Sequence, residues 1–343
     1  MHSSLMFLAS LMMHGLAVGK SISPGTAQLT QPYYPPNADC WEYKVPVTVT
    51  SENVVFDFPD WEDDYALQDF LTAATTRDSA RYPSPIPDEY NFVQHAISKG
   101  YSVWFYDRLG TGESEKVSGF TNQLRKQKAI LVQLAKIVKS GQYTGTFGKP
   151  DKLAAMGFSF GSFITHFAVA ENPTIADAAI LTAINYNTTG LNAKGLIRSF
   201  VPRVASLQNP RRFGLLNSGY LTWVDAIAQL NTYFKYPYYD LPTASYCEEY
   251  KQAFAIGEFL TIADGDFDAS GFTGAALAIT GETDYIICDG ECRGIFEEPA
   301  RTIWKNAKFE PYLHPHASHN FNFHHNATGA YGVITSFLES NGL

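Results

Sequence analysis

One pentapeptide, Gly157-Phe158-Ser159-Phe160-Gly161, most narrows the folds open to this chain. It follows an apolar run, Lys152 to Met156, that predicts a buried strand, and it precedes an apolar stretch, Ser162 to Ala170, that predicts a helix. G-x-S-x-G in that context is typical of a sharp turn that holds a serine at the carboxyl end of a sheet, and the glycines leave room for the turn. Ser159 is therefore the candidate nucleophile. The backbone N–H of Phe160, at the helix start, is the candidate oxyanion donor.

Strands alternate with helices along most of the remaining chain. Apolar runs predict strands over 101–106, 178–183, 275–280 and 308–313, and helical spacing predicts helices over 121–139 and 328–338. Residues 45–58 are predicted as a strand or hairpin, and residues 61–74 as a short acidic helix. This alternation predicts an α/β fold with a mostly parallel central sheet and helices on both faces.

The stretch 186–272 interrupts this rhythm and is rich in aromatic residues. We interpret it as a helical lid inserted between two strands of the core. Its rings either line an apolar acyl or aryl pocket or form the core of the lid itself, and the sequence favours neither. The predicted organisation is a signal peptide over 1–19, a first core part over 20–185, the lid over 186–272 and a second core part over 273–343.

A serine needs a base and an orienting acid to become nucleophilic, and in this type of fold they follow in the order serine, acid, histidine. Asp284 lies just past the predicted strand 275–280, and His319 lies after the last predicted strand. They are the candidate acid and base. Their rivals are Glu282 and Asp289 for the acid, and His314, His316, His324 and His325 for the base.

Metal, cofactor and nucleic-acid functions are disfavoured. Five histidines fall within twelve positions after 313, but no carboxylate sits among them at ligand spacing, so we predict no metal. The loop Asp107 to Ser114 lacks the third glycine of a dinucleotide motif, because Glu115 stands there, and we interpret it as a structural turn held by Asp107 and Arg108. We predict no cofactor. A net charge of −9 without a basic patch argues against nucleic acid as a partner.

The N-terminus has the features of a secretory signal peptide. Leu5 to Val18 is apolar except for Ser10, His14 and Gly15, and it ends in the small residues Ala17-Val18-Gly19. It is too short to predict a stable membrane span. The alternative is a buried N-terminal helix. We predict export of the mature chain to the extracellular space.

Cysteines and sequons agree with export. Asn187-Thr188-Thr189 and Asn326-Ala327-Thr328 are glycosylation sequons. Cys288 and Cys292 are close enough to bridge across a tight loop, which would leave Cys40 and Cys247 as a second pair, if it forms. The alternative is that all four are buried free thiols.

The motifs together resemble those of the fungal secreted-type α/β-hydrolase family with an AB hydrolase-1 domain. The resemblance runs from about Cys40 to the C-terminus, and it rests on the loop Asp107–Ser114, the turn at Ser159, Gly281-Glu-Thr-Asp284 and His319 with the Asn-Phe-Asn-Phe-His-His tail that follows it. It implies the α/β-hydrolase fold and hydrolysis of an ester-like bond of an apolar small molecule through an acyl-enzyme. It assigns Ser159, Asp284 and His319 as the triad.

The chain departs from this family at one place. Members carry an apolar strand ending in His-Gly before the strand at 101–106, and its loop supplies a second oxyanion donor. No such strand is found between Ala74 and Tyr101. We therefore expect a central strand to be missing. The alternatives to an active serine esterase are an impaired relative that binds an apolar ligand and a tailoring hydrolase or peptidase of a biosynthetic pathway. The sequence leaves the oligomeric state open.

Overall fold

The computed structural model describes residues 5–10, 41, 43–53, 88–186, 193–294 and 297–343. Within this part of the chain, six strands form a fully parallel sheet in the order β2-β1-β3-β4-β8-β9. The strands are β1 (Leu5–Ser10), β2 (Ser102–Phe105), β3 (Lys152–Phe158), β4 (Ala178–Thr182), β8 (Ala275–Gly281) and β9 (Lys308–His314). Since β3, β4 and β8 are buried along nearly their whole length, they show the continuous apolar pattern expected of a parallel sheet covered on both faces.

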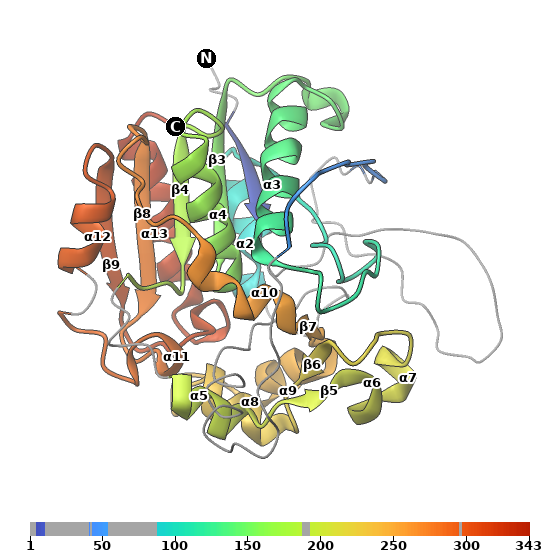
Figure 1. The fold of residues 1–343 in the computed structure, drawn as a ribbon. Helices are drawn as coiled ribbons and strands as arrows, with labels where there is room; N and C mark the ends of the chain where they lie inside the picture. Colours follow the sequence, from blue (N-terminus) through green and yellow to red (C-terminus); the bar gives the residue numbers. More distant parts are fainter. Residues whose placement is uncertain (1–4, 11–40, 42, 54–87, 187–192, 295–296) are drawn as a thin grey trace.

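Helices cover both faces of this sheet (Figure 1). The main ones are α2 (Phe92–Ser98), α3 (Leu124–Lys139), α4 (Phe160–Glu171), α12 (Glu297–Ile303) and α13 (Ala327–Ser340). Successive residues of β3 point to opposite faces, as strand geometry requires. Leu153 and Ala155 join the apolar cluster of α3 and α4, whereas Ala154 and Met156 join the cluster of α2 and α13. The sheet therefore separates two hydrophobic cores.

The segment 193–255, between β4 and β8, lies beyond the carboxyl ends of the strands, toward which the strand arrows point in Figure 1. The chain then returns along the sheet, where Phe267 packs against Phe163 and Phe167 of α4. The longer helices between β4 and β8 are α5 (Ala193–Phe200), α8 (Ala226–Tyr233) and α9 (Leu241–Tyr250), and the short ones are α6 (Ala205–Gln208), α7 (Pro210–Phe213) and α10 (Ile256–Leu260). The same region also contains a small antiparallel sheet in the order β5-β6-β7, formed by Arg203–Val204, Tyr220–Thr222 and Phe254–Ala255. The sequence predicted only helices here. Strands of two or three residues are too short to leave a recognisable alternation.

Remaining short elements complete the description. One-turn helices occur at α11 (Tyr285–Cys288) and at the 3₁₀ segments η1 (Asp88–Tyr90), η2 (Gly145–Phe147), η3 (Ile262–Asp264) and η4 (Phe321–Phe323). The predicted elements of the core are found with ends that differ by one or two residues in most cases. The helix predicted over 121–139 begins at Leu124, and α2 was not predicted.

The expectation of a missing central strand is wrong for the sheet described here. The position between β2 and β3 is filled by β1, the blue arrow in Figure 1, and Phe7 pairs with Val103 on one side and with Ala154 on the other. This strand comes from the stretch that was predicted to be a signal peptide. A continuous apolar run suits a central parallel strand as well as it suits the core of a signal peptide, so the sequence pattern could not separate the two.

Two further predictions concern the region before α2. Residues 45–53 form no strand, so the prediction of a strand or hairpin there is wrong for the residues that the structure describes. Their apolar and polar residues alternate, but the segment pairs with no sheet. Residues 54–58 and the acidic helix predicted over 61–74 lie outside the described residues.

Candidate active site

Ser159 occupies a sharp turn between β3 and α4. Its φ of 52° and ψ of −118° place a non-glycine residue at positive φ, a backbone strain of about 1–3 kcal/mol that persists only where the surroundings enforce it. The Ser159 N–H donates to the carbonyl of Thr182 on β4 at 2.8 Å. A Cβ on Gly157 would come within 2.2 Å of the Gly161 carbonyl oxygen, so the turn requires glycine at that position. The G-x-S-x-G pattern is thus explained by close backbone approach.

The structure brings Ser159, His319 and Asp284 into one hydrogen-bonded chain. Ser159 Oγ lies 2.8 Å from His319 Nε2, and His319 Nδ1 lies 2.8 Å from Asp284 Oδ2. Asp284 and His319 are fully buried, and Ser159 is only 4% exposed. Removal from bulk water strengthens such polar contacts. Since Nδ1 faces a carboxylate, the neutral imidazole carries its proton there and presents Nε2 to the serine as an acceptor.

Asp284 is fixed by the helix that it caps. Its Oδ1 accepts hydrogen bonds from the N–H groups of Ile286 and Ile287 at the start of α11, both at 2.9 Å. The other oxygen is then left for His319. Each carboxylate oxygen has its own partner, so the side chain cannot rotate without breaking three hydrogen bonds.

The loops that carry the acid and the base are in direct contact. Thr283 donates to the Ala317 carbonyl from both its N–H, at 3.0 Å, and its hydroxyl, at 2.9 Å. A Cβ on Gly281 would lie 2.5 Å from the same carbonyl oxygen. The absence of a side chain at the end of β8 therefore allows the two loops to meet.

The imidazole of His319 packs between two aromatic rings. Its centroid lies 5.3 Å from that of Phe158, at the end of β3, and 5.4 Å from that of Tyr233, at the end of α8. The N–H of Asn320 donates to the Tyr233 carbonyl at 3.0 Å. The aromatic composition of 186–272 is the one sequence signal for Tyr233, because its contact with His319 joins distant parts of the chain.

The start of α4 is supported by the loop Asp107–Ser114. Arg108 is buried in an ion pair with Glu258 of α10, and its guanidinium lies 5.3 Å from the ring centroid of Phe160. Asp107 Oδ2 accepts from the Glu113 N–H at 2.7 Å. Phe160 is the first residue of α4, where the N–H has no partner within the helix. The positive end of the helix and this N–H lie beside Ser159, as an oxyanion site requires.

The rival residues lie elsewhere in the site region. Glu282 Oε1 accepts from the His316 N–H at 2.7 Å, and Asp289 is exposed. His316 and His325 are exposed, and His314 is buried at the end of β9 with Nε2 2.8 Å from the Asn326 carbonyl. Burial lowers the pKa of His314. No group of three or more potential metal-ligating side chains occurs among the residues that the structure describes.

The described residues include one of the two predicted cysteine pairs and one of the two glycosylation sequons. Cys288 and Cys292 form a disulfide with their Cα atoms 5.1 Å apart, which closes the loop after Asp284. Cys247 is buried in α9, and its predicted partner Cys40 lies outside the described residues, as does Asn187. The side chains of Asn326 and Thr328 are exposed at the start of α13, so this sequon is accessible.

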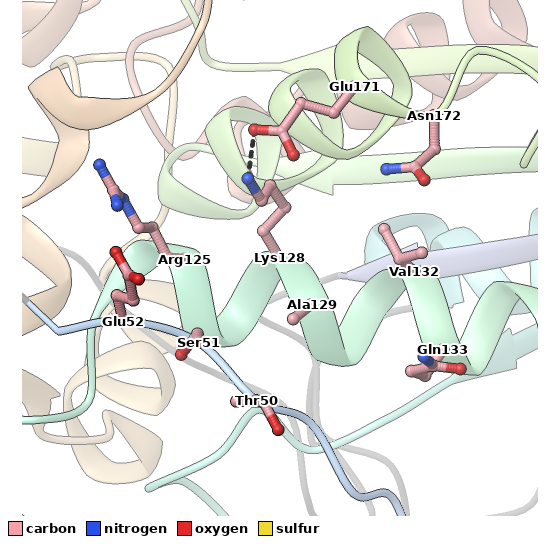
Figure 2. Close-up of a pocket in the computed structure, with 10 residues that line it drawn as sticks. All are labelled: Thr50, Ser51, Glu52, Arg125, Lys128, Ala129, Val132, Gln133, Glu171 and Asn172. Carbon is pink, nitrogen blue, oxygen red and sulfur yellow. Dashed lines mark hydrogen bonds and ion pairs between the residues drawn. The ribbon is translucent and has the colours of Figure 1, made fainter.

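A surface pocket lies far from the triad. It is formed by residues 50–52, α3 and the C-terminal end of α4, and an ion pair between Lys128 and Glu171 crosses it (Figure 2). Since α4 begins at the nucleophile and runs for 12 residues, this pocket is about 18 Å from Ser159 along the helix. None of the helices in the described part of the chain is both long enough and apolar enough to span a membrane.

Comparison with solved structures identifies the fold. A thermophilic esterase from Thermogutta terrifontis, solved with malate bound, matches 74% of this chain and 85% of its own, with 13% sequence identity and a TM-score of 0.50. This chain has the α/β-hydrolase fold. Two weaker likenesses have TM-scores below 0.5. An α/β-hydrolase fold protein from Chitinophaga pinensis matches 74% of this chain and 83% of its own, with 13% sequence identity and a TM-score of 0.46. A methylesterase from Arabidopsis matches 74% of this chain and 93% of its own, with 11% sequence identity and a TM-score of 0.48. No family model and no curated protein matches the chain.

A His-Gly pair is present near the N-terminus of the sequence. No His-Gly pair occurs between Ala74 and Tyr101, but the sequence contains one at His14-Gly15, a few residues after β1. The two residues lie outside the described part of the chain. The same stretch, an apolar run followed by His-Gly, also fits a signal peptide, and the sequence pattern alone does not separate the two.

Proposed function

We propose that this α/β-hydrolase-fold protein is a serine hydrolase that cleaves an ester-like bond of an apolar small molecule. The observation that carries the proposal is the buried chain of hydrogen bonds from Asp284 through His319 to Ser159. Ser159 also lies at a strained turn and at a helix start, which is the environment that a nucleophile of this kind needs. The similarity to an esterase structure supports the fold behind the proposal and not the substrate.

The geometry supports a two-stage reaction. Ser159 Oγ attacks the substrate carbonyl carbon while its proton passes to His319 Nε2, and the Asp284 carboxylate stabilises the resulting imidazolium. The Phe160 N–H stabilises the developing oxyanion. His319 then returns the proton to the leaving alcohol as the carbon–oxygen bond breaks, which leaves an acyl-enzyme. Water attacks this ester with His319 again as the base, and the carboxylic acid departs as Ser159 regains its proton.

An apolar substrate is favoured by the rings nearest the base. Phe158 and Tyr233 lie on His319, and Phe321 packs on Phe158 with 6.4 Å between ring centroids. Such an environment accepts acyl or aryl groups more readily than charged ones. An ester is favoured over an amide only by the family resemblance, and a peptidase or tailoring hydrolase would use the same triad.

Labelling with a fluorophosphonate tests the proposal, because the reagent reacts with activated serines. We expect labelling of the full chain to vanish in Ser159→Ala and to fall strongly in His319→Ala. The matched controls Ser140→Ala and His325→Ala change exposed residues and should label like the unaltered protein. A folded protein that does not label would contradict the proposal and favour a relative that only binds an apolar ligand.

A substrate panel then distinguishes among hydrolases. Nitrophenyl esters of increasing acyl length should be cleaved, and nitroanilides of the same acyl groups should be cleaved much more slowly. Faster cleavage of the anilides would instead favour a peptidase. Export stays a separate prediction, and it predicts a glycan at Asn187 or Asn326, of which Asn326 has an exposed side chain.

A further inference from the structure

A second histidine, His324, is fully buried five residues after the candidate base. It lies at the end of η4. In the described part of the chain, every hydrogen bond of its ring is to a backbone group. A histidine sealed in this way cannot reach a substrate. Its chemistry must therefore act through the residues that it holds.

The ring of His324 holds both neighbours of His319. Its Nδ1 lies 2.8 Å from the Asn320 carbonyl oxygen, and because a carbonyl only accepts, Nδ1 carries the proton and donates. Its Nε2 is then an acceptor, and the Ser318 N–H donates to it at 3.3 Å. One imidazole thus bonds the residue before the base and the residue after it.

The same ring joins this loop to the chain between β4 and β8. His324 Nε2 also accepts from the N–H of Lys235 at 3.1 Å, and the ring of Phe234 stacks on His324 with centroids 5.5 Å apart. The preceding residue, Tyr233, contacts the ring of His319 itself. His324 therefore fixes the loop against the aromatic segment that flanks the base.

We propose that His324 is a positioning residue for His319. His324 performs this role as a neutral imidazole that carries its proton on Nδ1. The inference rests on the proposed function, since it concerns the same base. A shift of about 1 Å in a catalytic group can lower a rate about 100-fold. The hydrogen bonds of His324 to Ser318 and Asn320 fix the backbone on both sides of His319, and they therefore fix the distance between His319 and Ser159. A side chain at this position must donate at one atom and accept at another to satisfy all three backbone groups.

Protonation of His324 would remove this arrangement. Both nitrogens would then donate, and Nε2–H would face two backbone N–H groups. Burial lowers the pKa of His324 to about 4. His314 and His325 act in the same direction, and the hydrogen bond to the Asn320 carbonyl and the charge of Asp284 oppose them. Two titratable residues of the segment 233–239 lie near His324. The side chain of Lys235 is exposed, and the ring centroid of Tyr239 lies 6.4 Å from that of His324. The ring is therefore neutral at physiological pH.

The test compares three variants by the kinetics of inactivation with an alkyl fluorophosphonate. In His324→Phe we expect the inactivation rate constant to fall about 100-fold while the inhibition constant changes less than about threefold. In His324→Gln, whose amide can donate and accept, we expect a rate within about tenfold of the unaltered protein. His325→Phe, an exposed neighbour, is the matched control and should be unchanged. Circular dichroism and melting curves normalise each rate to folded protein.

Failures of the two proposals are distinguishable. An unlabelled parent protein would overturn the proposed function and the positioning role with it. A labelled parent with an unaffected His324→Phe, or a Gln variant as slow as the Phe variant, would overturn the positioning role alone. If His324→Phe does not fold, ¹⁵N spectra of the histidine-labelled parent decide: we expect a neutral, Nδ1-protonated ring at pH 6. An Nε2-protonated or charged ring would overturn the inference.

Discussion

Replacement of Asp284 by asparagine separates the two roles of this side chain. Asp284 caps α11 through Oδ1 and orients His319 through Oδ2. Asparagine is as good a helix cap as aspartate, so its amide oxygen will keep the bonds to Ile286 and Ile287. Its NH₂ group must then occupy the position of Oδ2. That group can only donate, so it selects the imidazole tautomer with the proton on Nε2, which cannot accept the proton of Ser159.

The expected cost is large in rate and small in stability. A wrong tautomer in a serine–histidine–aspartate triad lowers kcat by about 10⁴, which corresponds to about 5.4 kcal/mol in the activation free energy. The free energy of unfolding should change by less than about 1 kcal/mol, because the cap is retained. Asp284→Ala is the matched comparison, since it loses the cap as well and should cost about 0.5–2 kcal/mol more in stability.

The assay is hydrolysis of a nitrophenyl ester and fluorophosphonate labelling at pH 7–8, with urea denaturation of each variant. An Asp284→Asn protein that retains activity within about tenfold of the parent would refute the assignment of Asp284 as the orienting acid. A variant that is inactive because it is unfolded would refute the claim that its cap survives.

Four further outcomes are expected. Deletion of residues 1–19 should lower the melting temperature and the folded yield, because β2 and β3 lose the strand between them; an equally stable deletion protein would instead favour removal of this segment as a signal peptide. Tyr186→Phe should lower the free energy of unfolding by about 1–3 kcal/mol in urea titrations, since its hydroxyl is 2.9 Å from Trp304 Nε1 and 3.2 Å from His166 Nδ1 in the core. Burial lowers the pKa of His166 to about 4, below the ordinary value of 6.5, so the unfolded state binds more protons between these values. The contribution of His166 to stability should fall by up to about 3 kcal/mol as the pH drops from 6.5 to 4, and His324 should add a loss of the same sign; a flat profile would contradict this. In exported protein, Asn326→Gln should remove a glycan visible as a mass difference, and an unchanged mass would argue against modification there.

The elements that the sequence predicted well are those whose pattern reflects local burial. β3, β4 and β8 are enclosed by helices on both faces, so each is a continuous apolar run bounded by polar residues or glycine. The triad candidates were chosen for a related reason. Each lies just beyond the carboxyl end of a predicted strand, and parallel strands deliver such residues to one edge of the sheet.

The features that escaped prediction depend on contacts between distant segments. His324 and Lys235 are 89 residues apart, and no spacing rule connects them. His324 was considered only as a rival base, because a sequence shows that a histidine is present but not whether its ring is sealed by backbone groups. The small sheet β5-β6-β7 escaped for a similar reason, since its pairing rather than its composition defines it.

The N-terminal apolar run shows why one pattern supported two interpretations. The core of a signal peptide and a central parallel strand both require uncharged apolar residues in sequence, one for the translocation machinery and one for burial on both faces. The consequences differ because β1 pairs with β2 on one side and β3 on the other. Removing it would leave backbone N–H and C=O groups unpaired on two strands, one of which leads directly to Ser159. Cleavage after residue 19 and the sheet described here therefore exclude each other in the same molecule. An exported, cleaved form would have to place another segment between β2 and β3. Cleavage of the N-terminal segment would therefore also change the strand that leads to Ser159 and, with it, the candidate active site.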